Sequence, residues 1–123
     1  MAKVLLVEDE RIVALALKHE LAAHGHQVVA IASSGAQALE ALATAEPEVV
    51  LMDVMIEGEI DGIETARQVS LRSAIPIIYL TGEADAATRK RAMHSPNCMG
   101  YLNKPVTAAA LSQVILSLNL QTA

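Results

Sequence analysis

The chain has 123 residues, 53% of them hydrophobic, and nine Lys and Arg against fourteen Asp and Glu give a net charge of −5. That length fits one domain with a real core, and the hydrophobic content excludes an intrinsically disordered chain. The negative charge and the presence of only two aromatic residues, both tyrosines, argue against direct nucleic-acid binding. We therefore expect a single domain over residues 1–123.

The sequence also lacks the signals of a secreted or membrane protein. Its longest apolar runs, such as Ile12 to Leu17, have about six residues, whereas a membrane span needs about 20. The first apolar run is too short and too closely followed by acids to be a signal peptide. The single cysteine, Cys98, can form neither an internal disulfide nor a zinc site of spaced cysteines. These features predict a cytoplasmic protein without membrane insertion.

Short apolar runs alternate with stretches of helical character five times along the chain. Aliphatic and β-branched runs predict the strands, and apolar spacing with helix-forming residues predicts the helices. In chain order the predicted strands and helices are Lys3–Val7, Arg11–His24, Gln27–Ala32, Ala36–Ala45, Val49–Met52, Ile63–Arg72, Ile77–Leu80, 86–93, Tyr101–Leu102 and 108–118.

Local signals place several of these boundaries. Gly25 lies where a helix C-cap is expected, and Pro47 ends the second predicted helix. Asp85 and Thr107 are the expected N-caps of the last two helices. Near-continuous apolar strands belong to sheets covered on both faces, and strand–helix alternation favours an α/β fold with a doubly wound parallel sheet.

Ionisable and hydroxyl residues follow four of the five predicted strands. Glu8 and Asp9 follow the first, Asp53 the third, Thr81 the fourth and Lys104 the fifth. The second strand ends without such a group, so we expect it at an edge of the sheet. Ligands of doubly wound sheets bind beyond the carboxyl ends of the strands, which makes this set the candidate site.

The chemistry of this set favours phosphoryl transfer. Three crowded carboxylates repel one another unless a cation neutralises them, and Mg²⁺ is the hard cation that best suits oxygen ligands. The Lys104 ammonium and the Thr81 hydroxyl complement phosphoryl oxygens. A carboxylate beside the metal can act as a nucleophile and form an acyl phosphate. We therefore interpret Asp53 as a phosphoryl acceptor in a magnesium-dependent site.

Five short motifs, in this order and spacing, carry a resemblance to a known family. The chain resembles the receiver domain of bacterial two-component response regulators, in the superfamily of the single-domain chemotaxis regulator. The resemblance runs from Lys3 to about Leu118. It implies a flavodoxin-like sheet of five parallel strands in the order 2-1-3-4-5 with five helices. The motifs are Val4–Glu10, Leu51–Met55, Asp61–Glu64, Leu80–Gly82 and Gly100–Pro105.

For the acceptor and the metal, the resemblance implies specific roles. Asp53 would take the phosphoryl group from a phosphohistidine. Asp9, Asp53 and the backbone carbonyl of Met55 would bind Mg²⁺, and Glu8 would act through a bound water. The domain would be a phosphoacceptor that catalyses its own phosphorylation and slow dephosphorylation, not an enzyme acting on a separate substrate.

The resemblance also implies which residues respond to phosphorylation. Thr81 would bond a phosphoryl oxygen, and Lys104 would pair with the phosphoryl group or with Asp53. Pro105 would follow a cis peptide bond. Tyr101 would turn inward as Thr81 moves toward the phosphate. One partner would be a histidine kinase or a phosphotransfer protein. The other would be a downstream protein, bound by the face of the fourth helix, fifth strand and fifth helix. The chain would be a monomer or a phosphorylation-dependent dimer.

The sequence departs from the common receiver pattern near the acceptor. The segment after Asp53 is longer and lacks proline, so we expect Glu57 and Glu59 to reshape the entrance to the site. In this family the positions of Met55 and Glu83 tune self-hydrolysis, and we expect the bulky Met55 to limit water access.

Other chemistry-bearing residues have ordinary interpretations. The basic run Arg89–Arg91 is typical of a solvated helix face, although that helix borders the expected partner surface. Cys98 is interpreted as a loop residue. The histidines are interpreted as surface or helix-end residues and four methionines as core or gap-filling residues. These are His19, His24, His26 and His94, and Met52, Met55, Met93 and Met99.

Three other functions are compatible with a doubly wound sheet of this size. A phosphorylation-independent, receiver-like interaction module remains the alternative, although the complete set of Asp9, Asp53, Thr81 and Lys104 argues against it. A dehalogenase-type phosphatase would need a second Asp where Met55 stands. A flavin-binding protein would need a phosphate-binding loop where the acids follow the first strand.

Overall fold

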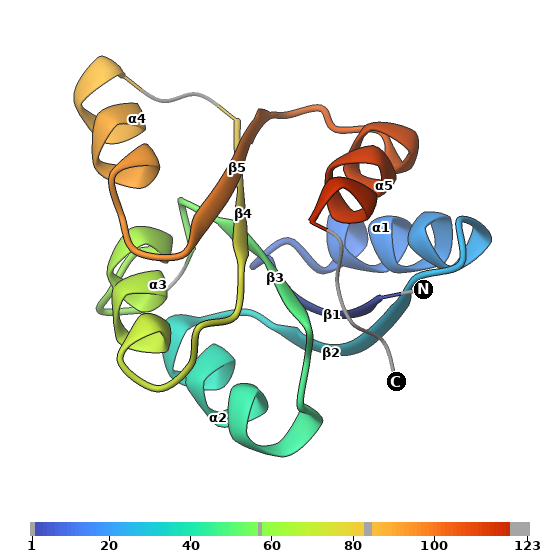
Figure 1. Ribbon diagram of the computed structural model, residues 1–123, viewed down its shortest axis with the longest axis horizontal. Coiled ribbons are helices and arrows are strands. Elements are labelled where there is room, and N and C mark those ends of the chain that lie inside the picture. Colours follow the sequence, from blue (N-terminus) through green and yellow to red (C-terminus); the bar gives the residue numbers. More distant parts are fainter. Residues whose placement is uncertain (1, 57, 83–84, 119–123) are drawn as a thin grey trace.

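Five parallel strands form one sheet in the order β2-β1-β3-β4-β5 (Figure 1). The structure is a computed structural model and describes residues 2–56, 58–82 and 85–118. The predicted doubly wound α/β fold is confirmed, with β2 at an edge as expected. The strands are β1 (Lys3–Val7), β2 (Gln27–Ala32), β3 (Val49–Asp53), β4 (Ile77–Thr81) and β5 (Cys98–Asn103).

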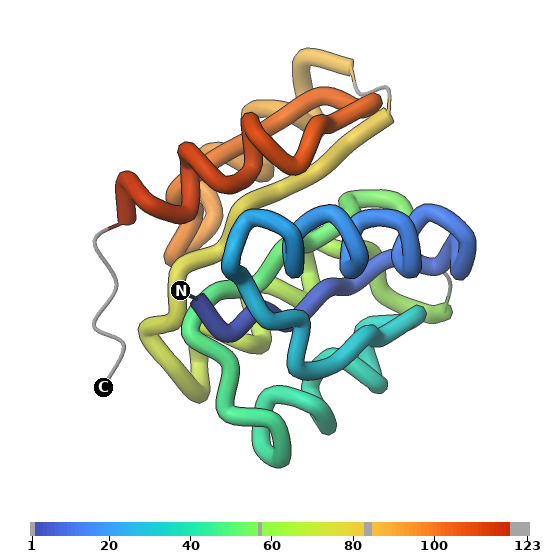
Figure 2. Tube along the Cα trace, turned by 90° about the vertical axis from the view of Figure 1, so that its right-hand side faces the viewer, coloured from blue at the N-terminus to red at the C-terminus, as the bar shows by residue number. Residues whose placement is uncertain are grey.

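Helices cover both faces of the sheet. α1 and α5 pack side by side on one face, and α2, α3 and α4 lie on the other (Figures 1 and 2). None of the helices in the described ranges is long and apolar enough to cross a membrane. The helices are α1 (Arg11–Ala23), α2 (Gly35–Ala45), α3 (Gly62–Ser70), α4 (Ala86–Met93) and α5 (Ala108–Ser117).

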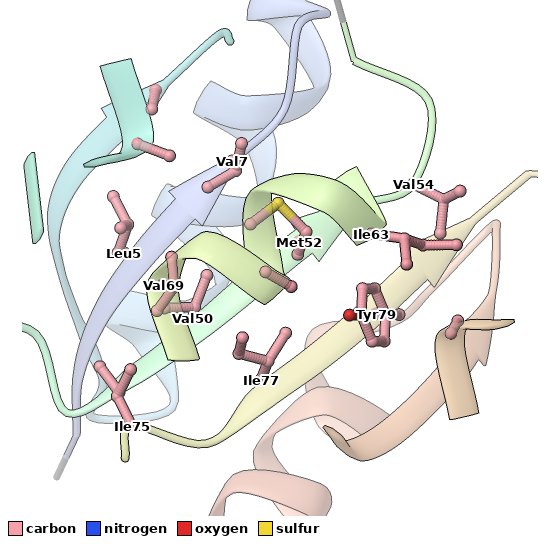
Figure 3. Close-up of a cluster of buried hydrophobic side chains, with 14 residues drawn as sticks. Leu5, Val7, Val50, Met52, Val54, Ile63, Val69, Ile75, Ile77 and Tyr79 are labelled. Carbon is pink, nitrogen blue, oxygen red and sulfur yellow. The ribbon is translucent and has the colours of Figure 1, made fainter. Parts of the chain in front are cut away.

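The hydrophobic core is divided by the sheet into two clusters. β3 and β4 are buried along their whole length, which explains their uninterrupted apolar sequences. The cluster under α2, α3 and α4 includes Met52, Ile63 and Tyr79 (Figure 3). Burial raises the pKa of Tyr79 to about 12, although its hydroxyl shares a 2.6 Å hydrogen bond with Ser95 Oγ.

Side-chain caps start four helices where the chain leaves the strand ends. Asp85 Oδ1 accepts a hydrogen bond from the Thr88 amide, and Thr107 Oγ1 accepts one from the Ala110 amide, which confirms both predicted caps. Ser34 and Asp61 cap α2 and α3 in the same way. The caps satisfy amides that the first turn of a helix leaves unpaired, and so fix where each helix leaves the site edge.

The fifth strand is longer than the sequence predicts. It begins at Cys98, not at Tyr101, so the interpretation of Cys98 as a loop residue is wrong. Residues 98–100 carry no aliphatic run, but their backbone pairs with β4, where Ile77 is opposite Cys98 and Ile78 is opposite Gly100. Pairing with a fully buried neighbour, and not local sequence, therefore defines the start of β5.

His26 is a buried residue, so the surface part of its interpretation as a surface or helix-end residue is wrong. It is 2% exposed, between α1 and β2. Nδ1 accepts a hydrogen bond from the Ala2 amide (3.3 Å), so Nε2 carries the proton and donates to Ser112 Oγ (2.9 Å). Burial lowers the pKa of His26, and the nearby His24 contributes in the same direction. Protonation at Nδ1 would break the bond with Ala2.

We expect His26 to make the fold acid-sensitive near neutral pH. A folded-state pKa below the unfolded value of about 6.5 leaves stability intact above that pH and removes it as the pH falls. The loss by pH 5.5 is at most about 1.4 kcal/mol. Urea unfolding of the His26→Gln variant should show a shallower decline from pH 7.5 to 5.5, and a variant of an exposed histidine on α1, His19→Gln, should decline like the unmodified protein. Equal slopes in all three proteins would contradict this role.

Candidate phosphoacceptor site

The predicted site residues lie at one edge of the sheet, at the carboxyl ends of β1, β3, β4 and β5 (Figure 1). Glu8 directly follows β1, and Asp53 is the last residue of β3, the strand between β1 and β4. Thr81 ends β4, and its carbonyl accepts a 2.6 Å hydrogen bond from the Lys104 amide. Strand order alone therefore brings together residues that are far apart in the sequence.

Lys104 joins the two buried carboxylates of the site. Its Nζ lies 2.7 Å from Glu8 Oε2 and 2.8 Å from Asp53 Oδ2. Glu8 is 1% and Asp53 3% exposed. The Lys104–Pro105 peptide is cis, as the resemblance implied. Ion pairs this well buried need good geometry to offset desolvation, and here one ammonium serves two carboxylates.

The charges of these groups perturb one another. Burial raises the pKa of Glu8, and the neighbouring Asp53 charge acts in the same direction, although hydrogen bonds from Lys104 and the Glu10 amide oppose the shift. Burial would lower the pKa of Lys104, but its hydrogen bonds with Asp53 and Glu8 outweigh burial, and the pKa is raised. Lys104 is therefore held as a cation between its two partners.

Three acids in succession after β1 form a cluster beside this ion pair. Carboxylate oxygens of Glu8, Asp9 and Glu10 lie within 4.8 Å of one another. Asp9 and Glu10 are exposed, and Glu8 Oε1 also accepts a 3.1 Å hydrogen bond from the Glu10 amide. Glu10 has no role among the sequence predictions, although it directly follows Asp9 in the sequence.

The Asp53 side chain is oriented from both sides. Asp53 Oδ1 accepts a 3.0 Å hydrogen bond from the Met55 amide, and Oδ2 contacts Lys104. This bond folds the chain back after β3 and keeps Met55 beside the carboxylate. Met55 is 68% exposed, so its interpretation as a core or gap-filling residue is wrong, as it is for the exposed Met93 and Met99.

The long segment after Asp53 reaches toward α2. A Cβ on Gly35, the first residue of α2, would lie 2.7 Å from Ile60 side-chain atoms, so Ile60 packs closely against this glycine. Gly58 has a positive φ of 104°, which favours glycine. Glu59 is exposed. Two residues with predicted effects lie outside the described residues. They are Glu57, expected to reshape the entrance to the site, and Glu83, expected to tune self-hydrolysis.

Thr81 and Tyr101 occupy different environments. Thr81 is fully buried, and its Oγ1 has no hydrogen-bond partner among the described residues. Tyr101 lies on β5 opposite Tyr79, is partly buried, and has the Arg89 guanidinium 5.7 Å from its ring centroid. The basic run on α4, interpreted from its sequence as a solvated face, gave no signal of this contact.

The model of the response regulator receiver domain family matches residues 4–116. The chain belongs to this family. The chain is therefore a receiver domain of the kind that response regulators of two-component systems contain. The fold and the position of the acidic edge are those expected from the motifs.

Named relatives agree with this assignment. The chain is 35% identical over 111 residues to "Transcriptional regulatory protein AfsQ1" of Streptomyces coelicolor, an alignment covering 90% of this chain and 48% of that protein. It is 31% identical over 113 residues to "Transcriptional regulatory protein PdtaR" of Mycobacterium tuberculosis, covering 92% and 54%. The chain therefore spans about half the length of these curated relatives.

Solved structures share the fold. The signal receiver domain of a modulated diguanylate cyclase from Desulfovibrio desulfuricans has a TM-score of 0.87 and 35% identity, over 95% of this chain and 92% of that one. A CheY-like receiver domain from Methanospirillum hungatei has a TM-score of 0.85 over 96% and 93%, with 21% identity, and supports the fold alone.

Proposed function

We propose that this receiver accepts a phosphoryl group on Asp53 from a phosphohistidine of a histidine kinase or phosphotransfer protein. The observation that carries the proposal is the Glu8–Lys104–Asp53 arrangement. It holds a buried carboxylate at the carboxyl edge of the sheet, against an ammonium that can balance added negative charge. Membership of the receiver family supports the same role.

The donor set of this edge fits Mg²⁺. Glu8, Asp9 and Asp53 supply oxygen ligands only, and among the described residues Lys104 is the one cation paired with the two buried carboxylates. Hard divalent cations prefer such oxygen donors. Asp9, Asp53 and the Met55 carbonyl would hold the ion, with Glu8 acting through a water. When bound, Mg²⁺ supplies positive charge to the phosphoryl oxygens.

The transfer step uses the acceptor and its neighbours. A carboxylate oxygen of Asp53 attacks phosphorus, and the phosphorus–nitrogen bond of the phosphohistidine breaks. Its electron pair stays on the imidazole, and the product on the receiver is an acyl phosphate. Lys104 remains beside the transferred group and balances its charge, which is roughly two units at neutral pH. Attack of water on the acyl phosphate releases inorganic phosphate and restores Asp53.

Thr81 and Tyr101 would transmit the change. The Thr81 hydroxyl, which none of the described residues pairs with, gains a partner if it turns toward a phosphoryl oxygen, and this new contact favours one state of the switch. Tyr101 would turn inward as Thr81 moves. The downstream protein partner would bind the face formed by α4, β5 and α5.

The proposal predicts that Thr81→Val does not destabilise the fold. Removing a buried hydroxyl that has no hydrogen-bond partner in the described part of the chain should leave the free energy of unfolding unchanged or raise it by up to about 1 kcal/mol. Thr65 is a matched control, because it is also fully buried but donates a 2.8 Å hydrogen bond to the Asp61 carbonyl. Thr65→Val should cost about 1 kcal/mol in urea unfolding. If Thr81→Val costs as much as Thr65→Val, its hydroxyl has a structural partner and the proposed role is wrong.

The phosphoacceptor proposal is tested by intact mass. The protein is incubated with Mg²⁺ and acetyl phosphate, with Asp53→Ala and a magnesium-free sample as controls. We expect one added phosphoryl group, absent from both controls. No adduct, together with no spectroscopic response to beryllofluoride, would instead support the phosphorylation-independent interaction module.

A further inference from the structure

α4 is attached to the fold by few apolar contacts. Of its eight residues only Ala92 is buried, and three consecutive residues, Arg89 to Arg91, are basic. Its capping residue Asp85 is exposed. A helix with so little buried apolar surface depends on individual side-chain contacts for its position.

Two arginines of α4 reach different parts of the molecule. The Arg89 guanidinium lies over the Tyr101 ring, 5.7 Å from its centroid, within the range of a cation–π contact. Arg91 Nη1 lies 3.4 Å from Asp61 Oδ2 at the start of α3, and the side chains are 57% and 36% exposed, respectively. Lys90, between them, is exposed.

Tyr101 has a fixed neighbour against which its movement can be judged. Tyr79 is opposite it in the β4–β5 pairing, is fully buried, and is bonded through its hydroxyl to Ser95 Oγ. Ser95 Oγ in turn donates to the Ala92 carbonyl of α4 (2.7 Å). Tyr101 is the partly buried member of the pair, and its visible contact to α4 is with Arg89.

We infer that Arg89 is a latch that holds Tyr101 in its resting position and thereby opposes the response to phosphorylation. This inference rests on the proposed function, because an inward turn of Tyr101 would remove its ring from the guanidinium. A contact that is present in one state and absent from the other shifts the equilibrium by its own free energy. Loss of the cation–π contact should therefore favour the activated state about two- to fivefold.

The direction of the change in beryllofluoride affinity distinguishes a latch from a general electrostatic effect. Beryllofluoride, a phosphoryl mimic, is anionic when bound to the acceptor. Removing a positive charge anywhere near the site weakens anion binding, within the limits of ionic screening. Removing the latch strengthens it. Arg89→Gln and Lys90→Gln lose the same charge one residue apart, and only Arg89→Gln loses a contact to Tyr101.

The experiment uses fluorotyrosine-labelled protein and fluorine NMR. The chain has two tyrosines and so two resonances, which Tyr101→Phe assigns. Without ligand, we expect Arg89→Gln to move the Tyr101 resonance toward its position in the beryllofluoride complex and to leave the Tyr79 resonance in place. In a titration with Mg²⁺ present, half-saturation should occur at a beryllofluoride concentration about two- to fivefold lower than in the unmodified protein.

Controls distinguish the ways in which the inference can fail. Lys90→Gln should bind beryllofluoride no more tightly than the unmodified protein, and so should Arg91→Gln, which breaks the pair with Asp61 instead. If the unmodified protein responds to beryllofluoride but Arg89→Gln has unchanged or weaker affinity, the latch is refuted and the phosphoacceptor function stands. If the unmodified protein does not respond, the proposed function fails and the latch fails with it.

Discussion

Replacing Lys104 with Met should destabilise the protein by about 3 kcal/mol, because it leaves two buried carboxylates without their cation. In the structure Lys104 Nζ is within 2.8 Å of both Glu8 and Asp53. Without the lysine, the Glu8 carboxyl, whose pKa is raised by burial and by the Asp53 charge, loses an opposing hydrogen bond. The stability deficit of the variant relative to the unmodified protein should therefore shrink as the pH falls from 7 toward 5.5. Added Mg²⁺ should restore stability more strongly in the variant than in the unmodified protein.

Urea unfolding with and without Mg²⁺ measures this effect. Lys90→Met is the matched control, since Lys90 is exposed on α4 and its loss should change the free energy of unfolding by less than about 0.5 kcal/mol. A Lys104→Met variant as stable as Lys90→Met would mean that the Glu8 and Asp53 carboxylates do not depend on the lysine. A loss of stability that Mg²⁺ does not reduce would argue against a metal site at these acids.

Much of the site was predictable because it follows from strand order. The side chain after each buried apolar run lies at the same edge of a parallel sheet, whatever the loops between them do. Glu8, Asp53 and Thr81 therefore come together from local sequence signals alone. Placing Lys104 at this edge also required the fifth strand to be predicted, and the sequence pattern indicated only Tyr101–Leu102 of that strand.

The contacts that join distant segments were not predictable in this way. Lys104 and Glu8 are 96 positions apart, and which acid the lysine meets depends on the distances between strand ends. His26 is buried because Ser112 of α5 lies over it, 86 positions away. Arg89 belongs to a charged helix without a clear apolar face, so its contact with Tyr101 has no local signal. Each miss concerns a side chain whose environment is built by another element.

The tightest steric constraint at the site is at Gly62, and Gly62→Ala should be among the most damaging single changes. A Cβ there would overlap the carbonyl oxygen of Asp53 and would lie 2.9 Å from Val54 Cα. Both neighbours are backbone, and the Gly62 amide donates to the Val54 carbonyl, so no flexible side chain can move aside. Overpacking of this kind costs about 3 kcal/mol, and relief requires a shift of β3 itself.

Gly82→Ala is the control, because a Cβ at Gly82 meets nothing within 4 Å among the described residues. We expect Gly82→Ala to unfold within about 0.5 kcal/mol of the unmodified protein. We expect Gly62→Ala to lose stability and, in conditions where it remains folded by circular dichroism, to take up phosphoryl from acetyl phosphate more slowly. The second effect follows because displacing the Asp53 carbonyl also displaces its side chain from Lys104. A Gly62→Ala variant as stable and as reactive as Gly82→Ala would show that the close packing of α3 on β3 does not hold Asp53 in place.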